Sequence, residues 1–68
     1  MTKYEIIQID GDHAITWASL DAHEVRNTLP YFMKMNHPED FFLVDTEKYK
    51  MFPVPFVYNK MKEYWFEV

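Results

Sequence analysis

The chain has 68 residues, among them two tryptophans, five tyrosines, six phenylalanines, a single glycine and no cysteine, and its formal net charge is -4 at pH 7. This length allows one domain, residues 1–68, and the missing cysteines exclude both a disulfide framework and a thiolate metal site. The negative charge disfavours nonspecific binding to nucleic acid, and no apolar run reaches the ~18 residues of a membrane span. We expect an intracellular, cytoplasmic protein without a membrane segment.

A β-hairpin is predicted at the N-terminus. Residues 3–9 and 13–18 are rich in β-branched and aromatic side chains, and the acidic Asp10-Gly11-Asp12 segment separates them. We expect a two-residue turn at Asp10-Gly11, with the glycine supplying a positive φ. The same triplet does not indicate a calcium loop, because the other oxygen ligands of an EF-hand are missing.

The predicted turn fixes which side chains face each other across the hairpin. Ile9 would oppose Asp12, so that Ile6 pairs with Ile15 and Tyr4 pairs with Trp17 on one face. Cross-strand pairs of this kind contribute roughly 0.2–1 kcal/mol each, which favours this register over one shifted by a single residue.

A helix is predicted next, over about Asp21–Met35. Asp21 suits the N-cap position, and Glu24 three residues later completes a capping box. An apolar stripe at helical spacing begins at Val25. Proline inside a helix removes a backbone hydrogen bond, so we expect the helix to be kinked or broken at Pro30.

The second half of the sequence reads mainly as strands. Asn36–Asp40 is a turn cluster, and the apolar run Phe41–Val44 is typical of a central strand covered on both faces. The segment Tyr49–Tyr58 contains two prolines, which predicts an extended edge segment. Met61–Val68 is predicted to be a last strand, because it contains the Tyr64-Trp65-Phe66 run of strand-forming residues.

The order of elements predicts an α+β domain. We expect a small, mostly antiparallel sheet of four or five strands, formed by the N-terminal hairpin and the C-terminal strands. The kinked helix would pack on one face of the sheet, and the other face would be left for solvent or a partner.

The sequence holds few residues suited to catalysis or metal binding. Ser19 is the only serine, and it is better explained as a loop residue before the helix. His13, His23 and His37 do not have the spacing of a compact zinc site. A phosphate-binding loop needs several glycines, and this chain has one. We therefore expect no catalytic motif, no metal and no cofactor, and the sequence does not favour an enzyme.

Aromatic residues are the most informative feature of the chain, because a domain of this size hides only about 60% of the surface of its unfolded chain. Some rings must then stay exposed or be covered by another molecule. Tyr, Trp and Met are enriched at interfaces, and exposed apolar patches mark contact sites. The predicted partner-binding residues combine aromatic and acidic side chains: Phe52, Phe56, Tyr58, Tyr64, Trp65, Asp40 and Glu47.

These observations favour a non-enzymatic protein-protein interaction module, for example an inhibitor or a bacterial or phage accessory protein with an acidic, aromatic-rich surface. The partner would be another protein or a second copy of the chain. The alternative is a homo-oligomeric small-molecule binder or enzyme whose pocket forms between protomers. Four lysines lie among aromatic residues, as in proteins that bind single-stranded nucleic acid: Lys48, Lys50, Lys60 and Lys62. Exposed strand positions and turn residues that protect sheet edges explain them better.

Overall fold

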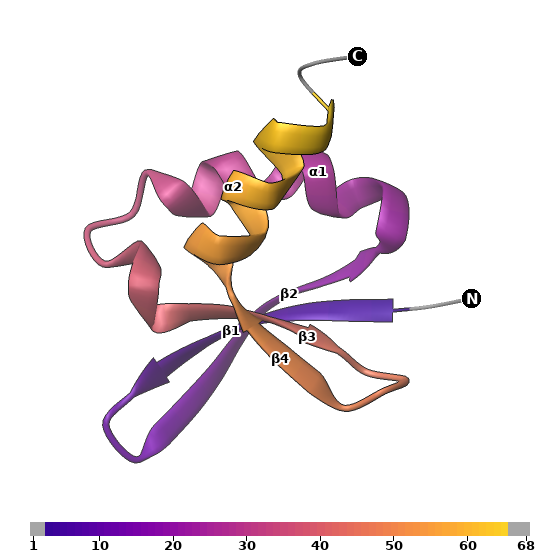
Figure 1. Ribbon diagram of the computed structural model, residues 1–68. Coiled ribbons are helices and arrows are strands. Elements are labelled where there is room, and N and C mark those ends of the chain that lie inside the picture. Colours follow the sequence, from indigo (N-terminus) through magenta and orange to yellow (C-terminus); the bar gives the residue numbers. More distant parts are fainter. Residues whose placement is uncertain (1–2, 66–68) are drawn as a thin grey trace.

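The computed structural model describes the backbone of residues 3–65 and the side chains of residues 3–61. Its elements are β1 (Lys3–Asp10), β2 (His13–Asp21), α1 (Ala22–Met33), the 3-10 turn η1 (Pro38–Asp40), β3 (Phe41–Asp45), β4 (Lys50–Pro53) and α2 (Val54–Trp65) (Figure 1). The strands form one antiparallel sheet in the order β2-β1-β3-β4. The predicted α+β fold with a four-stranded antiparallel sheet is confirmed.

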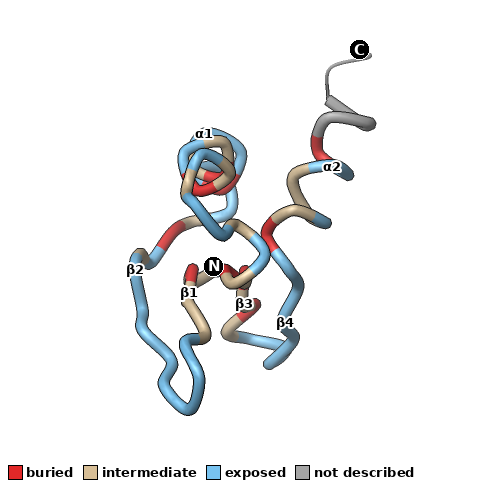
Figure 2. Tube along the Cα trace, turned by 90° about the vertical axis from the view of Figure 1, so that its left-hand side faces the viewer, coloured by how far each residue is buried: buried red, intermediate tan, exposed pale blue. Residues whose placement is uncertain are grey.

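Both helices lie on the same face of the sheet. α1 contacts β1 and β2, and α2 contacts β3 and β4, so the two helices share the covering of one face (Figures 1 and 2). Among the residues that the structure describes, neither α1 nor α2 has the length and apolar character of a membrane-spanning helix. No described helix covers the opposite face, which we call the open face and which carries Ile7, Ile9, Phe42, Val44 and Met51.

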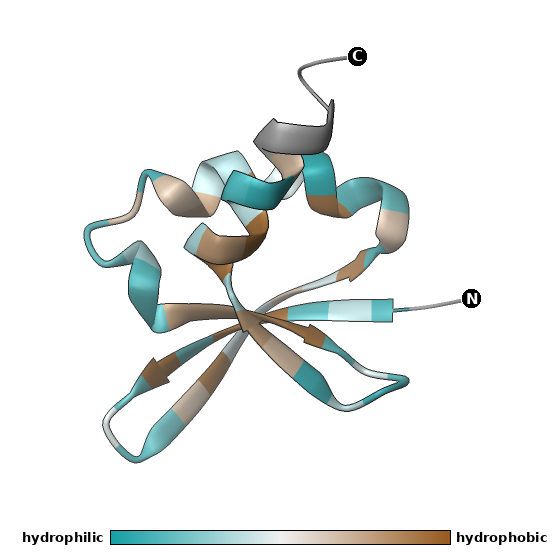
Figure 3. Ribbon diagram, viewed as in Figure 1, coloured by the Kyte–Doolittle hydropathy of each residue, from teal (hydrophilic) through white to brown (hydrophobic). Residues whose placement is uncertain are grey.

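The core is a single layer between the sheet and the helices. Its centre consists of three fully buried side chains, Ile6 from β1, Leu29 from α1 and Val54 from α2. The other buried apolar side chains of the described part are Leu20, Val25, Phe32, Phe41, Leu43 and Met61. Hydrophobic segments accordingly alternate with hydrophilic ones along the strands and both helices (Figure 3).

The N-terminal hairpin forms as predicted, but its register differs. Asp10 pairs with His13, so the two-residue turn is Gly11-Asp12 instead of Asp10-Gly11. Gly11 has a φ of 61°, which confirms that this glycine supplies the left-handed conformation. Near the turn the pairing is therefore shifted by two residues along β2, and Ile15 faces Gln8 instead of Ile6.

A β-bulge changes the pairing further along the hairpin. Ile7 pairs with Thr16 and Ile6 pairs with Ala18, so Trp17 is the extra residue. The predicted Tyr4–Trp17 pair is therefore wrong. The Trp17 ring instead packs edge-on against Phe32 and Phe41, with centroid distances of 6.2 and 5.6 Å.

Helix α1 follows the prediction at its start. Asp21 is the N-cap residue, and Oε1 of Glu24 accepts a hydrogen bond from the Asp21 N–H at 2.9 Å. Val25, Leu29 and Phe32 are the buried residues of the helix, which confirms the apolar stripe. The helix runs through Pro30 without a break and ends at Met33, two residues before the predicted end.

Strand β3 occupies an inner position in the sheet, but only one of its faces is covered. Phe41, Leu43 and Asp45 are buried beneath the helices, whereas Phe42 and Val44 on the open face are half-buried. The expectation of cover on both faces is wrong, because both helices pack on the same side of the sheet.

The C-terminal segment differs most from the prediction. The chain is extended only over β4, Lys50–Pro53, and the expected strand from Met61 is part of the helix α2 up to Trp65. Pro55 lies in the first turn of α2, where the missing N–H costs no helical hydrogen bond. Residues 66–68 of the predicted strand lie outside the described residues.

The central position of Leu29 gives a test of the core. We expect Leu29→Ala to lower the free energy of unfolding by about 2–5 kcal/mol, because the side chain is fully buried and its removal leaves a cavity. Met51→Ala is the matched control, since Met51 is 50% exposed and should cost less than about 1 kcal/mol. Urea unfolding followed by circular dichroism measures both values, and equal losses in the two variants would contradict this description of the core.

Candidate interaction surface

Large exposed apolar side chains gather around the edge strand β4. Tyr49 and Met51 are 89% and 50% exposed, and Phe52 and Phe56 are 39% and 51% exposed. We call these four residues the β4 patch. Met51 belongs to the open face and Phe52 to the helix-covered face, so the patch wraps around the edge of the sheet and continues onto the first turns of α2.

The predicted aromatic contact residues are found in different environments. Phe52 and Phe56 are both exposed members of the β4 patch, at the end of β4 and the start of α2. Tyr58, by contrast, is half-buried and packs against the core. The side chains of Tyr64 and Trp65 lie outside the described residues.

The two predicted acidic contact residues are separated from each other by the length of β3. Asp40 ends η1 and directly precedes β3, whereas Glu47 lies in the turn between β3 and β4. A five-residue strand spans about 17 Å, so the structure does not bring these carboxylates together.

Lysines and one carboxylate, Glu47, accompany the aromatic rings of the β4 patch. Nζ of Lys60 lies 5.8 Å from the centroid of the Phe56 ring, within the range of a cation–π contact. Lys48 and Lys50 flank Tyr49 in the sequence, and both are exposed. The described charged residues at the rim of this surface are therefore of both signs, three lysines and Glu47.

A pocket of about 390 Å³ adjoins the β4 patch on the helix-covered face. Side chains from five elements line it: Tyr4, Ala22, Val25, Leu43, Asp45, Phe52, Val57 and Met61. Apart from Asp45 and the hydroxyl group of Tyr4, this lining is apolar. Phe52 belongs to both the pocket wall and the β4 patch, so the two features form one continuous surface.

Among the described side chains of the pocket lining, Asp45 is the only carboxylate, and its geometry indicates a structural role. Its Oδ1 accepts hydrogen bonds from the backbone N–H groups of Glu47 and Lys48, at 3.0 and 3.1 Å. These bonds close the turn after β3. They also satisfy the Asp45 carboxylate, which is only 9% exposed. The pocket is consequently suited to an apolar group, and the lining residues that the structure describes include no second acidic or basic side chain for proton transfer.

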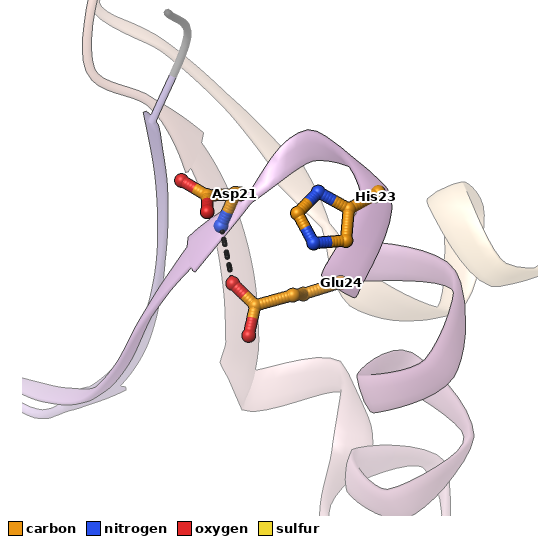
Figure 4. Close-up of side chains that lie close together, drawn as sticks. All are labelled: Asp21, His23 and Glu24. Carbon is orange, nitrogen blue, oxygen red and sulfur yellow. Dashed lines mark hydrogen bonds between the residues drawn. The ribbon is translucent and has the colours of Figure 1, made fainter.

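Three possible metal ligands lie close together at the start of α1. Asp21, His23 and Glu24 place one ligand atom each within 4.8 Å of the others (Figure 4). The structure already gives two of them other partners. Glu24 accepts the hydrogen bond from the Asp21 N–H, and Oδ1 of Asp21 lies 2.9 Å from Nζ of Lys3. The cluster is therefore explained by helix capping and an ion pair.

The Lys3–Asp21 ion pair joins the first residue of β1 to the last residue of β2. The hydrogen bond from Lys3 lowers the pKa of Asp21, and the hydrogen bond to Asp21 raises the pKa of Lys3. Both groups are accessible to water, so the pair contributes little to the free energy of unfolding. Its main effect is to hold the ends of β1 and β2 together.

The structure does not assemble a serine-histidine site from the residues it describes. Ser19 is an exposed residue of β2, and no described hydrogen bond joins it to a histidine. His13 and His23 flank opposite ends of β2, a strand of nine residues that is about 30 Å long.

Comparison of the chain with known protein families, with curated proteins and with solved structures gives no match. Its function has to be inferred from its own side chains.

Two features of this region were not predicted from the sequence. The pocket draws its lining from elements distant in sequence, including a helix that was expected to be a strand. Tyr49 has a φ of 56°, an unusual value for a bulky residue, and its strand-like composition gave no signal of this turn conformation. The lysines beside the rings could be read from the sequence, since Lys48, Lys50 and Lys60 alternate with aromatic residues there.

The ion pair predicts how stability depends on pH. Because its folded-state pKa is lowered, Asp21 contributes stability above its ordinary value of 3.8, and this contribution is lost as the pH falls through the folded-state value. Asp21→Asn keeps a good N-cap and removes only the charge. We expect the variant to be less stable than the wild type at pH 7, with a difference that shrinks below about pH 4. Urea unfolding at several pH values measures this difference, and a pH-independent gap would contradict the assignment.

Proposed function

We propose that the protein is a non-enzymatic module that binds another protein, and that the β4 patch and the adjoining pocket receive apolar side chains of that partner. The observation that carries the proposal is the continuity of two exposed rings, Phe52 and Phe56, with an apolar pocket of about 390 Å³. Contact sites in proteins combine such a recess with aromatic residues around it.

The size and lining of the pocket suit a partner side chain. Its volume lies near the lower end of the roughly 300–1,000 Å³ of ligand-binding pockets, which is ample for one or two aliphatic or aromatic side chains. The lining offers apolar contact on nearly all sides, and the Asp45 carboxylate is held by backbone amides. Binding by burial of apolar surface requires no catalytic group in the recess.

Tyr49 provides a second argument, from backbone geometry. A positive φ at a non-glycine residue destabilises the fold by about 1 kcal/mol or more. The Tyr49 ring is 89% exposed, so its packing within the chain offsets little of this destabilisation. Asparagine tolerates this conformation better than tyrosine. The presence of a tyrosine at this position favours a role of its ring in contact with another molecule.

The positions of the charged residues bear on the predicted acidic part of the contact surface. Carboxylates at Asp40 and Glu47 lie beyond opposite ends of β3, whereas Lys60 contacts the Phe56 ring. We therefore assign the apolar contacts to the β4 patch and do not include an array of carboxylates in the contact. An inhibitor that occludes a site on its partner would use the same apolar surface.

Capture of a binding protein from the source lysate, followed by substitutions at the surface, tests the proposal. Phe56→Ala and Tyr49→Asn are expected to reduce retention of the captured protein at least tenfold, because each removes a ring from the contact surface. Tyr49→Asn should also leave the free energy of unfolding unchanged or slightly raised, since it relieves the strained turn.

Tyr31→Ala is the matched control, because Tyr31 is 67% exposed and lies beside Phe32, whose ring contacts Trp17 of the opposite edge strand β2. Retention that survives Phe56→Ala and Tyr49→Asn but is lost in Tyr31→Ala would place the contact elsewhere. Native mass spectrometry that finds a tightly held metabolite and no protein would favour the alternative of a small-molecule binder.

A further inference from the structure

The two edges of the sheet differ in how well they are protected against pairing with another strand. β4 is only four residues long and contains Lys50 and Pro53, and short length, lysine and proline are the usual devices that protect an edge. β2 is nine residues long, and between His13 and Asp21 it contains neither a charged residue nor a proline. Long uncharged edge strands readily pair with a further strand.

The described part of the chain leaves the outer edge of β2 unpaired, and most of the strand is exposed. The bulge at Trp17 is the one protective irregularity in it. Residues 13–16 before the bulge pair in regular register with β1, so their outward backbone groups keep the spacing that another strand needs.

Apolar side chains lie beside this edge as well. Ile15 is 46% exposed, Trp17 is 50% exposed, and Tyr31 on α1 is 67% exposed. Phe32 links them, since its ring centroid lies 6.2 Å from that of Trp17 and 5.8 Å from that of Tyr31. We call Ile15, Trp17 and Tyr31 the β2 patch.

We propose that two copies of the chain pair through antiparallel β2 strands, so that the two four-stranded sheets join into one continuous sheet and the two β2 patches meet across the twofold axis. This inference goes beyond the proposed function, because it uses neither Phe52, Phe56 nor the pocket. Such addition of a strand at a sheet edge supplies main-chain hydrogen bonds, and closed twofold dimers are the commonest homo-oligomers.

The distribution of charge favours a second copy as the occupant. The net charge of -4 would oppose self-association if acidic groups met at the contact. The segment Ala14–Leu20 is uncharged, so two copies can align it without placing like charges opposite each other. Asp21 at the end of the strand is already paired with Lys3.

The Trp17 ring is already fixed in a position suited to such a contact. Its Nε1 donates a hydrogen bond to Oε1 of Gln8 at 3.0 Å, and its ring packs edge-on against Phe32 and Phe41. A side chain held in this way loses little conformational freedom on binding. The contact would combine backbone pairing of residues 13–16 with burial of the β2 patch of each copy.

Sedimentation velocity with light scattering over a series of concentrations tests the proposal. The average mass of the wild-type protein in solution is expected to rise with concentration toward about 16.6 kDa, twice the 8.3 kDa of one chain. Ile15→Lys should stay at the mass of one chain at every concentration, because it places like charges along the paired edges. Thr16→Lys is a second edge variant, and circular dichroism establishes that each variant is folded.

Met51→Lys is the matched control, because this substitution makes the same change in charge as the β2 variants. Met51 is 50% exposed and lies on the open face at the other edge of the sheet. This variant should dimerise like the wild type. A wild type that remains a monomer at all concentrations overturns the proposal. So does a dimer that both β2 variants leave intact, or one that Met51→Lys alone dissociates, which would assign the contact to the open face.

Discussion

The whole structure depends on one thin apolar layer between the sheet and the helices. Ile6, Leu29 and Val54 meet at its centre, one from the sheet and one from each helix, and all three are completely buried. Both helices lie on the same side of the sheet, and each contacts two of its four strands (Figure 2). No cysteine is present to reinforce this layer, so the fold depends on packing and noncovalent polar contacts and has no disulfide.

A layer of this size cannot hold the aromatic residues of the chain. Phe32 and Phe41 are buried in it, with ring centroids 5.1 Å apart, but other large rings stay exposed at the two sides of the molecule. The exposed rings separate into two groups, one beside each edge strand. The β4 patch adjoins a recess and lysines, whereas the β2 patch adjoins an unprotected strand edge, so the two groups are suited to different kinds of contact.

Local signals allowed much of the first half of the fold to be predicted. The single glycine located the hairpin turn, and the Asp21–Glu24 capping pair located the start of α1. The register could not be derived, because Gly11 fits the second central position of a type I′ turn at Asp10-Gly11 as well as the first central position of a type II′ turn at Gly11-Asp12. The structure has the second arrangement, with a positive φ at Gly11 but not at Asp12. The two possible turns shift the pairing by two residues, and the bulge at Trp17 then adds one more.

The second half was harder to predict because its signals conflict. Two prolines and the run Tyr64-Trp65-Phe66 favour extended structure, yet Val54, Val57 and Met61 at helical spacing face the core and the pocket. Packing against the sheet prevailed over strand propensity. The pocket could not be anticipated for the same reason, since two of its lining residues, Val57 and Met61, belong to this helix.

The central claim is that this chain carries more aromatic surface than its core can bury, and that the excess lies at defined positions. The most direct measurement uses nuclear magnetic resonance. It records how strongly a soluble paramagnetic agent enhances the relaxation of each aromatic ring proton in the free protein. We expect strong relaxation for Tyr49, Phe52 and Phe56, and weak relaxation for Phe32 and Phe41, because only the last two rings are buried. Protection of Phe52 and Phe56 equal to that of Phe41 would contradict the account.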